Sequence, residues 1–210
     1  MNLRKPLVIA GAVAALAVPL AACSSSGDHS SMNMSSSSSV TIPDSANFNA
    51  TDVGFAQGMI PHHAQAVEMA DLAIANTKNP DVLALARQIK AAQSPEIEKM
   101  TAWLNSWGQA IPSTAMGSMS GHDMSRMDGM MMDGMMSQAD MDRLSTSTGS
   151  AFDRLWIELM IQHHEGAVKM SKSEVAGGKN TEAKALAQSI ITSQQAEISS
   201  MQSLLTKLPA

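Results

Sequence analysis

Apolar positions recur with a helical period in the region that begins near residue 51. When successive residues advance by about 100° around a helix, the apolar side chains of residues 51–76 fall on one broad face. That face contains Asp52, Phe55, Met59, Ile60, His63, Ala66, Val67, Ala70, Ala73 and Ile74, with His62 and Met69 on its edge. Pro61 removes one backbone donor, so we expect a kink at the histidines or one turn before them.

A second helix is predicted after a turn at Lys78-Asn79-Pro80. Asp81 is the expected N-cap, and Gly108 and Pro112 end the helix near Trp107. Its inner face contains Val82, Leu85, Ala86, Ile89, Gln93, Ile97, Met100 and Leu104. Residues 51–108 are therefore predicted to form a helical hairpin.

The second half of the chain repeats this plan at a constant offset of 101 residues without a gap, and about 20 of 53 aligned positions are identical. The aligned pairs include Asp52 with Asp153, Asn79 with Asn180 and each candidate ligand named below. A second hairpin is predicted at 150–208, with helices at 153–177 and 181–208 around the turn 177–180. Two hairpins predict an all-α fold, a single four-helix bundle domain at 48–210.

A methionine-rich linker, residues 113–136, joins the two hairpins. Residues 115–141 hold 10 of the chain's 19 methionines, together with His122 and four aspartates. The segment has no helical period. A short helix at 138–147 is predicted after it, because Ser137 and Asp140 have the spacing of a capping box.

The N-terminus has the form of an export signal. Arg4 and Lys5 precede an apolar run at 7–22, which ends in Leu20-Ala21-Ala22-Cys23. This ending resembles a lipobox, so we expect residues 1–22 to be a lipoprotein signal peptide and Cys23 to carry lipid; an uncleaved anchor is the alternative. Residues 23–47 are mostly serine and are predicted to be a flexible tether. The protein is thus expected to be extracytoplasmic and lipid-anchored to the cell membrane.

Charge and cysteine content narrow the chemistry. Without Arg4 and Lys5 the chain has 12 basic and 19 acidic residues, a net charge of −7, which argues against a nucleic-acid partner. Cys23 is the only cysteine. Once it carries lipid, the mature chain has no thiol for a disulfide, a thiolate metal site or nucleophilic catalysis.

Methionine and histidine fall into repeat pairs inside the hairpins. Thioether and imidazole together are the ligand set of copper, above all Cu(I), with Ag(I) as its mimic and Cu(II) as a further candidate. The candidate metal ligands are Met59, His62, His63, Met69, Met100, Met160, His163, His164, Met170 and Met201. Buried amides and carboxylates on the second helix of each hairpin need partners, and imidazole N–H groups are the natural ones. We therefore expect Gln93, Glu96, Gln194 and Glu197 to orient the histidines, with Glu96 as an occasional ligand.

The linker adds an auxiliary set of soft donors, predicted to collect Cu(I) weakly and pass it to the bundle. This set is Met116, Met119, His122, Met124, Met127, Met130, Met131, Met132, Met135 and Met136. The alternative for the linker is a spacer whose methionines scavenge oxidants.

Other functions fit the sequence less well. A single buried methionine is most often gap filler, but two His-His pairs flanked by methionine at equal offsets favour metal. A di-iron oxidase would need Glu-x-x-His, and a zinc hydrolase would need His-Glu-x-x-His; neither motif is present. No nucleophile elbow is recognisable, so we interpret the chain as a binding protein and not an enzyme. The remaining alternative is a lipid-anchored helical interaction module whose histidines are structural.

Four motifs carry a resemblance to a known family. They are Met59-Ile60-Pro61-His62-His63, the run Gln93 to Met100, the run Met160 to Ala167, and the run Gln194 to Met201. At these residues the chain resembles the bacterial secreted proteins of the domain of unknown function 305 family. The resemblance implies a ferritin-like four-helix bundle and a role in extracytoplasmic copper or silver storage, buffering or delivery. One departure is Gln65-Ala66, where the family pattern is Gly-Ala, as at Gly166-Ala167; we expect it to tighten the packing without removing a ligand.

Overall fold

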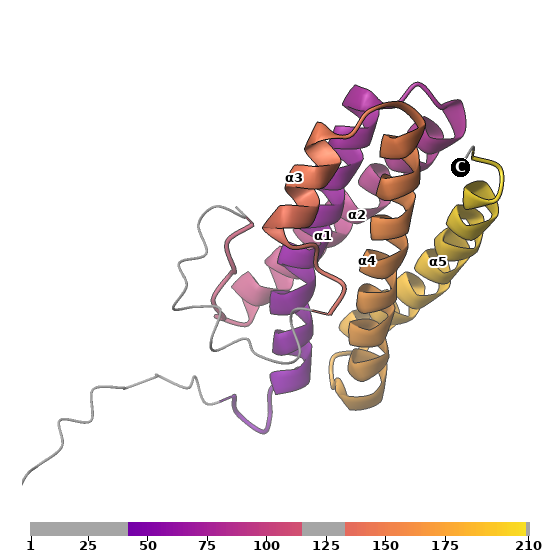
Figure 1. The fold of residues 1–210 in the computed structure, drawn as a ribbon. Helices are drawn as coiled ribbons and strands as arrows, with labels where there is room; N and C mark the ends of the chain where they lie inside the picture. Colours follow the sequence, from indigo (N-terminus) through magenta and orange to yellow (C-terminus); the bar gives the residue numbers. More distant parts are fainter. Residues whose placement is uncertain (1–41, 115–132, 209–210) are drawn as a thin grey trace, which may run out of the picture. The chain divides into compact units, whose positions relative to one another are not determined.

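The computed structural model describes residues 42–114 and 133–208. Within those ranges the chain is all-helical, with five helices and no strand, which confirms the predicted fold class. The helices are α1 (Ala50–Asn76), α2 (Pro80–Ser106), α3 (Gln138–Thr146), α4 (Gly149–Gly177) and α5 (Thr181–Leu205) (Figure 1). The expected signal peptide, Cys23, most of the serine-rich tether and linker residues 115–132 lie outside the described residues.

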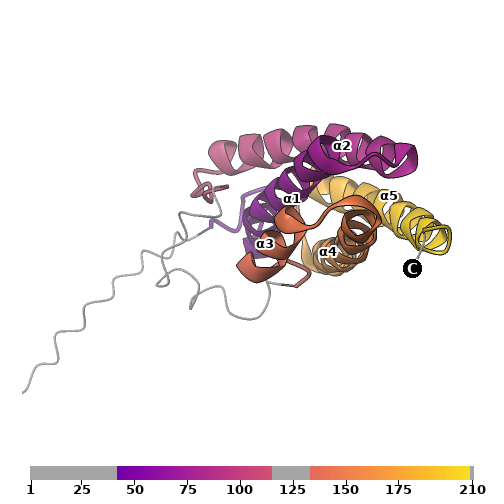
Figure 2. The same ribbon diagram turned by 45° about the horizontal axis from the view of Figure 1, so that its top comes forward.

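The long helices form two hairpins, α1 with α2 and α4 with α5. The hairpins meet mainly through α1 and α4, and α3 lies beside both of these helices (Figure 2). In contrast, α2 and α5 touch each other at only a few positions. The ferritin-like character of this arrangement stays a prediction.

Helices α1 and α4 run antiparallel. At one end of their shared seam, Asn49 Nδ2 donates a hydrogen bond to the Gly177 carbonyl at 2.9 Å. Between the middle of the seam and its other end, the Trp156 indole N–H donates to the Met69 carbonyl at 2.8 Å. At the far end, the Thr77 hydroxyl donates to Asp153. These contacts place the middle of α1 opposite the middle of α4.

Helix boundaries differ from the sequence prediction in three places. The N-cap of α2 is Asn79 and not Asp81, because the Asn79 side chain accepts from the backbone N–H groups of Asp81 and Val82. Pro80 then occupies the first helical position, where its missing N–H costs nothing. Helix α4 begins four residues earlier than expected, at Gly149, and α5 ends at Leu205 instead of 208. Helix α1 continues through Pro61.

The short helix α3 has the predicted cap. The Ser137 hydroxyl accepts from the Asp140 backbone N–H at 3.1 Å, and the Asp140 carboxylate accepts from the Ser137 backbone N–H at 3.3 Å. Both halves of the capping box are thus present. Met141 and Leu144 are the buried residues of this helix, and they join the core between α1 and α4.

The paired aspartates Asp52 and Asp153 fasten each hairpin to the turn of the other. Asp52 is fully buried and accepts from the backbone N–H groups of Lys179 and Asn180 at 2.9–3.0 Å. Its repeat partner Asp153 accepts from Thr77, in the turn of the first hairpin. These long-range bonds fix the register of α1 against α4.

The last residues of the predicted tether are attached to the bundle. Phe48 is buried and stacks on Trp107 at a ring-centroid distance of 4.7 Å. Lys179 Nζ donates to the Asp44 carbonyl at 2.8 Å. The carbonyls of Asp44 and Asn47, at the end of the predicted tether, thus accept hydrogen bonds from side chains in the second hairpin's turn.

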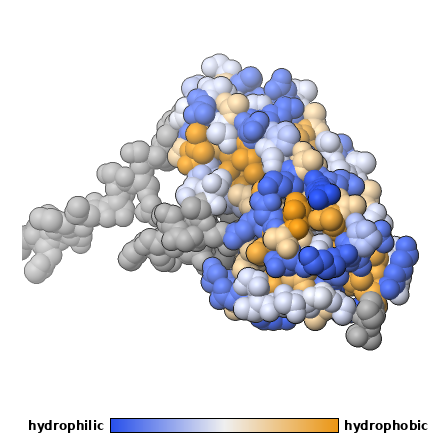
Figure 3. All heavy atoms as spheres, turned by 90° about the horizontal axis from the view of Figure 1, so that it is seen from above, coloured by the Kyte–Doolittle hydropathy of each residue, from blue (hydrophilic) through white to orange (hydrophobic). Residues whose placement is uncertain are grey.

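The described helices differ from membrane-spanning ones. None of those in residues 42–114 and 133–208 combines the length and the apolar character that crossing a bilayer requires. On the face seen in Figure 3, hydrophobic residues form small groups between hydrophilic ones.

Glu174, in α4, is a buried carboxyl beside Asp52. Its exposed fraction is 1 %, and burial, reinforced by Asp52, raises its pKa to about 8. The space next to it is closed, since a Cβ on Gly178 would lie 2.2 Å from Glu174 Oε1. Glu174 is therefore protonated in the folded protein at neutral pH.

Replacing Glu174 by glutamine should change how stability depends on pH. The raised pKa means that the stabilising contribution of the neutral carboxyl is complete below its ordinary pKa of 4.5 and is lost as pH rises to about 8. Glutamine does not titrate. We expect the melting temperature of Glu174→Gln, minus that of the wild type, to become more positive from about pH 5 to about pH 9 in the metal-free protein. A difference that stays constant across this range, measured by circular dichroism, would contradict the assignment.

Candidate metal centre

The centre of the α1–α4 seam is occupied by two imidazole rings. His62 of α1 and His163 of α4 are fully buried, and their ring centroids lie 3.7 Å apart at an interplanar angle of 41°. They are equivalent positions in the repeat, which follows from antiparallel packing of two copies of one helix about an approximate twofold axis. The pair therefore marks the point where the two hairpins cross.

The second histidine of each pair turns toward its own hairpin. His63 Nε2 lies 2.7 Å from Glu96 Oε2 of α2, and His164 Nε2 lies 2.8 Å from Glu197 Oε2 of α5. Both imidazoles are fully buried, and the carboxylates are largely covered, with exposed side-chain fractions of 18 % and 8 %. The predicted role of the two glutamates as imidazole partners matches this geometry.

These contacts decide which ring nitrogen can bind a metal. A carboxylate only accepts hydrogen bonds, so a neutral His63 or His164 carries its proton on Nε2. The lone pair is then on Nδ1, and Nδ1 of both rings has no hydrogen-bond partner among the described residues. A carboxylate that holds one imidazole N–H while the other nitrogen faces a metal is a common arrangement in metalloproteins.

Burial without partners is costly for these rings. Six imidazole nitrogens in the described part of the chain lack a hydrogen bond: both of His62, both of His163, and Nδ1 of His63 and His164. Each buried polar group left unpaired costs about 1–3 kcal/mol, and the total is a large share of a domain's usual stability of about 5–15 kcal/mol. Apolar side chains of similar size would fill the same space without this cost, so packing alone does not account for the four histidines.

Burial also keeps the central pair neutral. Desolvation, followed by the neighbouring histidines, holds the pKa of His62 and that of His163 well below the ordinary value of 6.5. The backbone of Asp133 acts in the opposite direction and raises the pKa of His62. It does not form a hydrogen bond with the His62 ring, because its position relative to the ring nitrogens does not meet hydrogen-bonding geometry. Both rings thus keep a free lone pair at neutral pH, which is the form that binds metals.

The six repeat methionines are buried, and the core divides them into two sets. Met59, Met100 and Met170 belong to one contiguous cluster, while Met69, Met160 and Met201 belong to the other. Each set combines two methionines of one hairpin with one from the other, because antiparallel packing places Met69 beside Trp156 and so near the α4 turn that carries Met160. The sequence alone did not reveal this exchange.

We define two candidate half-sites by adding, to the methionines of each cluster, the histidine–glutamate pair of the hairpin that supplies two of them. Half-site one comprises His63, Glu96, Met59, Met100 and Met170. Half-site two comprises His164, Glu197, Met160, Met201 and Met69. His62 and His163 lie between them, 6.4 and 6.5 Å from His63 and His164 by ring centroid. All ten predicted ligands are thus buried in the bundle.

The two predicted glutamines do not bond to the histidines. Both side-chain polar atoms of Gln93 and the Oε1 of Gln194 are buried without a hydrogen-bond partner in the described residues. Glu197, in contrast, has a second partner, since Gln88 Nε2 of α2 donates to its Oε1 at 3.2 Å. That bond is one of the few links between α2 and α5.

One contact near the site was missed by the sequence prediction. Gln65 is fully buried and forms two hydrogen bonds with the backbone of Met136, at the end of the linker. Met136 is itself buried, whereas Met135 is half-buried. The sequence did contain a sign of this contact, because Gln65 replaces the glycine of the family's Gly-Ala pattern. That departure was interpreted only as tighter packing. The other predicted linker donors, at positions 116–132, lie outside the described residues.

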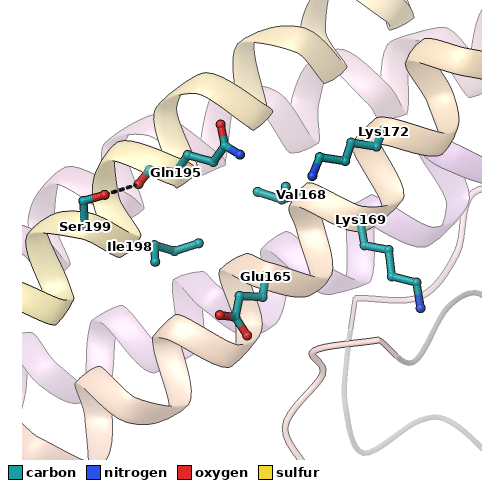
Figure 4. A pocket seen from close by; sticks show the side chains of 7 residues that line it. All are labelled: Glu165, Val168, Lys169, Lys172, Gln195, Ile198 and Ser199. Carbon is teal, nitrogen blue, oxygen red and sulfur yellow. Dashed lines mark hydrogen bonds between the residues drawn. The ribbon is translucent and has the colours of Figure 1, made fainter.

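A surface pocket between α4 and α5 is separate from the histidines. Its walls come from Glu165, Val168, Lys169, Lys172, Gln195, Ile198 and Ser199 (Figure 4). No candidate ligand lines it, and Glu165, although adjacent to His164 in sequence, is exposed. Within residues 42–114 and 133–208, no group of three or more His, Cys, Asp and Glu side chains is arranged to hold a metal ion.

Comparison with known proteins decides the family. The domain of unknown function DUF305 matches residues 52–205. The chain belongs to the DUF305 family. A DUF305 protein from Streptomyces coelicolor, of known structure, is 33 % identical with a TM-score of 0.66, and the match covers 75 % of this chain and 93 % of that one. A DUF305 fragment from Deinococcus radiodurans is 31 % identical with a TM-score of 0.65, covering 76 % and 98 %.

A third structural relative of this DUF305 chain, CopM, has been solved with metal. CopM in its Cu(I)-bound form is 31 % identical with a TM-score of 0.59, and the match covers 74 % of this chain and 96 % of CopM. CopM has also been solved in Cu(II)-bound and silver-bound forms. No protein with a curated description matches the chain.

The neutral central pair predicts a pH dependence of the metal-free protein. Because folding lowers the pKa of His62 and His163 below 6.5, the unfolded chain binds more protons once the pH falls below that value. Their contribution to stability is therefore complete above about pH 6.5 and is lost as the pH falls. We expect the melting temperature of the wild type to fall more steeply between pH 7.5 and pH 5 than that of His62→Gln/His163→Gln.

Comparing the wild type with His62→Gln/His163→Gln isolates the contribution of the central histidine pair to the pH dependence of stability. Glu174 is present in both proteins, so its contribution cancels. Circular dichroism melts at matched ionic strength provide the measurement. Parallel pH profiles of the wild type and the double variant would show that the pair is not held neutral by the fold.

Proposed function

We propose that this protein binds copper as Cu(I), accepts Ag(I) in the same sites, and serves in storage, buffering or delivery of the ion. The observation that carries the proposal is the set of buried imidazole nitrogens without partners, grouped with six buried methionines. Imidazole and thioether are soft, neutral donors that suit Cu(I) better than zinc, calcium or magnesium. CopM, about 30 % identical over three quarters of this chain, supports the assignment through its Cu(I)-, Cu(II)- and silver-bound forms.

The charge of the half-sites favours a monovalent ion. Each half-site contains one carboxylate, Glu96 or Glu197, and otherwise neutral donors. A single positive charge in the site is therefore balanced by the carboxylate that its histidine ligand contacts. The cost of burying an ion rises with the square of its charge, so a divalent ion in the same donor set would leave a net charge in a low-dielectric interior. Cu(I) and Ag(I) fit this constraint.

We also propose that the protein works outside the cytoplasm, attached to the membrane through lipid on Cys23, and that it is not an enzyme. The lipobox-like Leu20-Ala21-Ala22-Cys23 supports the anchor. The methionine-rich linker supports a handling role, because thioethers remain unprotonated at any pH and so can collect Cu(I) where imidazoles cannot.

The first test of copper binding is a Cu(I) titration of the mature protein against a competing chelator. We expect two tight ions in the wild type, loss of one in His63→Ala, loss of one in His164→Ala, and loss of both in the double variant. The matched control is His122→Ala, which removes a linker histidine and should leave both tight ions. If the wild type does not compete with the chelator, the copper assignment fails and the protein is better explained as a helical interaction module.

The carboxylates provide a finer test. Glu96→Gln should keep every proposed ligand but remove the acceptor that orients His63 and balances the ion. Loss of such a supporting group typically lowers metal affinity by about 10–100-fold. We expect that decrease for half-site one only, and Glu197→Gln should act in the same way on half-site two. An unchanged affinity in both variants would show that the glutamates play no part in binding.

Metal should stabilise a fold that already exists. The bundle buries its own apolar faces, so the metal-free protein should have a helical circular dichroism spectrum. A ligand present at about 1,000 times its dissociation constant stabilises the native state by about 4 kcal/mol per site, so Ag(I) should raise the melting temperature. A coil-like spectrum without metal would show instead that metal creates the fold.

A further inference from the structure

The two half-sites differ in their hydrophobic clusters, because the cluster that contains the methionines of half-site two has more sulfur. Its cluster contains Met136 and Met141 in addition to the three repeat methionines, and both are nearly inaccessible, with exposed fractions of 6 % and 5 %. The cluster of half-site one contains only its three repeat methionines among the described residues, and its end of the bundle is closed by Phe48 and Trp103. The repeat alone would make the two ends alike, so the difference comes from residues outside the repeat.

Met136 is held in place by Gln65. Gln65 Nε2 donates to the Met136 carbonyl at 2.9 Å, and the Met136 N–H donates to Gln65 Oε1 at 2.7 Å. Gln65 lies on α1 between His62 and Met69, about one turn from each. The backbone of Met136 is therefore fixed at the level of the central histidine and of a methionine of half-site two.

The segment just before Met136 is fastened to α4. A Cβ on Gly166 would lie 2.0 Å from the Asp133 carbonyl oxygen, and a Cβ on Gly134 would lie 2.7 Å from the Gln162 carbonyl oxygen. Only glycine at both positions allows this approach of two backbones. Lys169 of α4 forms an ion pair with Asp133. Because α1 and α4 are antiparallel, Gly166 and Gln65 lie on opposite sides of the His62/His163 pair, so residues 133–136 cross the α1–α4 seam at the level of that pair.

Gln65 and Gly166 are partners in the repeat, and their difference breaks the symmetry. On α1, the Gln65 side-chain amide forms hydrogen bonds with the Met136 backbone. On α4, Gly166 has no side chain, so the Asp133 backbone can approach closely. Residues 133–136 could not bind with their direction reversed. Asp133 would then approach Gln65, whose side chain would clash with the backbone that Gly166 now accommodates. The sequence therefore specifies which half-site receives the additional methionines.

We propose that Met136 and Met141 are thioether donors of half-site two, with Gln65 as the residue that positions Met136. This inference rests on the proposed function. The added donors are neutral, so they soften the site without changing its charge. Half-site two is then the tighter site for Cu(I) and Ag(I) and fills first, directly from the end of the methionine-rich linker.

The test compares the removal of sulfur with a change of packing alone in the full mature protein. Leucine conserves the volume and burial of methionine but has no donor, so Met136→Leu/Met141→Leu should fold normally. Against a competing chelator, we expect the wild type to show two unequal affinities for Cu(I). In the double variant the tighter affinity should decrease at least tenfold, and the weaker one should be unchanged. The matched control is Leu144→Ile, a volume-conserving change at a buried residue of the same cluster that removes no sulfur, and it should behave as the wild type.

Gln65→Ala tests the positioning role. It keeps both sulfur atoms but removes two hydrogen bonds to Met136, so the tighter affinity should decrease while the weaker one is retained. Glu96→Gln, which acts at half-site one, should instead lower only the weaker affinity.

The outcomes separate the two claims. If the wild type binds no Cu(I) tightly, the proposed function fails. If the wild type binds two ions and Met136→Leu/Met141→Leu matches it, copper binding stands and this inference is wrong. An equal loss at both half-sites also overturns the inference, because it indicates a general effect on the fold.

Discussion

The antiparallel packing of α1 against α4 is the constraint on which the rest of the structure depends. It brings His62 and His163 to a centroid distance of 3.7 Å and exchanges Met69 and Met170 between the hairpins. Asp52 and Asp153 maintain its register by binding the turn of the opposite hairpin. Without that register the four imidazoles would not share one interior, and each hairpin would present a histidine pair to solvent. The metal chemistry proposed for this protein is thus a property of the seam and not of either hairpin alone.

Burying neutral donors without partners affects both the stability of the metal-free protein and the proposed affinity for metal. Unpaired imidazole nitrogens destabilise the metal-free protein, and an ion bound as proposed would satisfy the lone pairs and remove that penalty. Part of the free energy of binding is therefore a relief of destabilisation already present in the fold. Glu96 and Glu197 keep the proton on Nε2 of their histidines and leave Nδ1 free, so the donor atoms are set before an ion arrives. Preorganisation of this kind favours tight binding by a site that changes little in shape.

The fold and most candidate ligands could be predicted from the sequence, because both depend on short-range spacing. Helical period identified the inner faces, the offset of 101 residues identified the two hairpins, and Ser137 with Asp140 located α3. Contacts between helices could not be predicted, since they depend on how α1 lies along α4. This explains why Gln65 was interpreted as packing and why the exchange of Met69 was missed. Asn79 was missed as the α2 cap because two polar residues, Asn79 and Asp81 on either side of Pro80, compete for that position, and the choice depends on where Pro80 lies in the helix.

The measurement that tests the central claim most directly is X-ray absorption at the copper edge of the mature protein loaded with Cu(I). The account predicts that the ions are coordinated by both nitrogen and sulfur, from imidazole and thioether together. It also predicts that the sulfur contribution decreases in Met59→Leu/Met160→Leu, while the helical content is unchanged. A spectrum with only nitrogen or oxygen neighbours, or one that is the same in this variant, would contradict the assignment of the buried methionines as ligands.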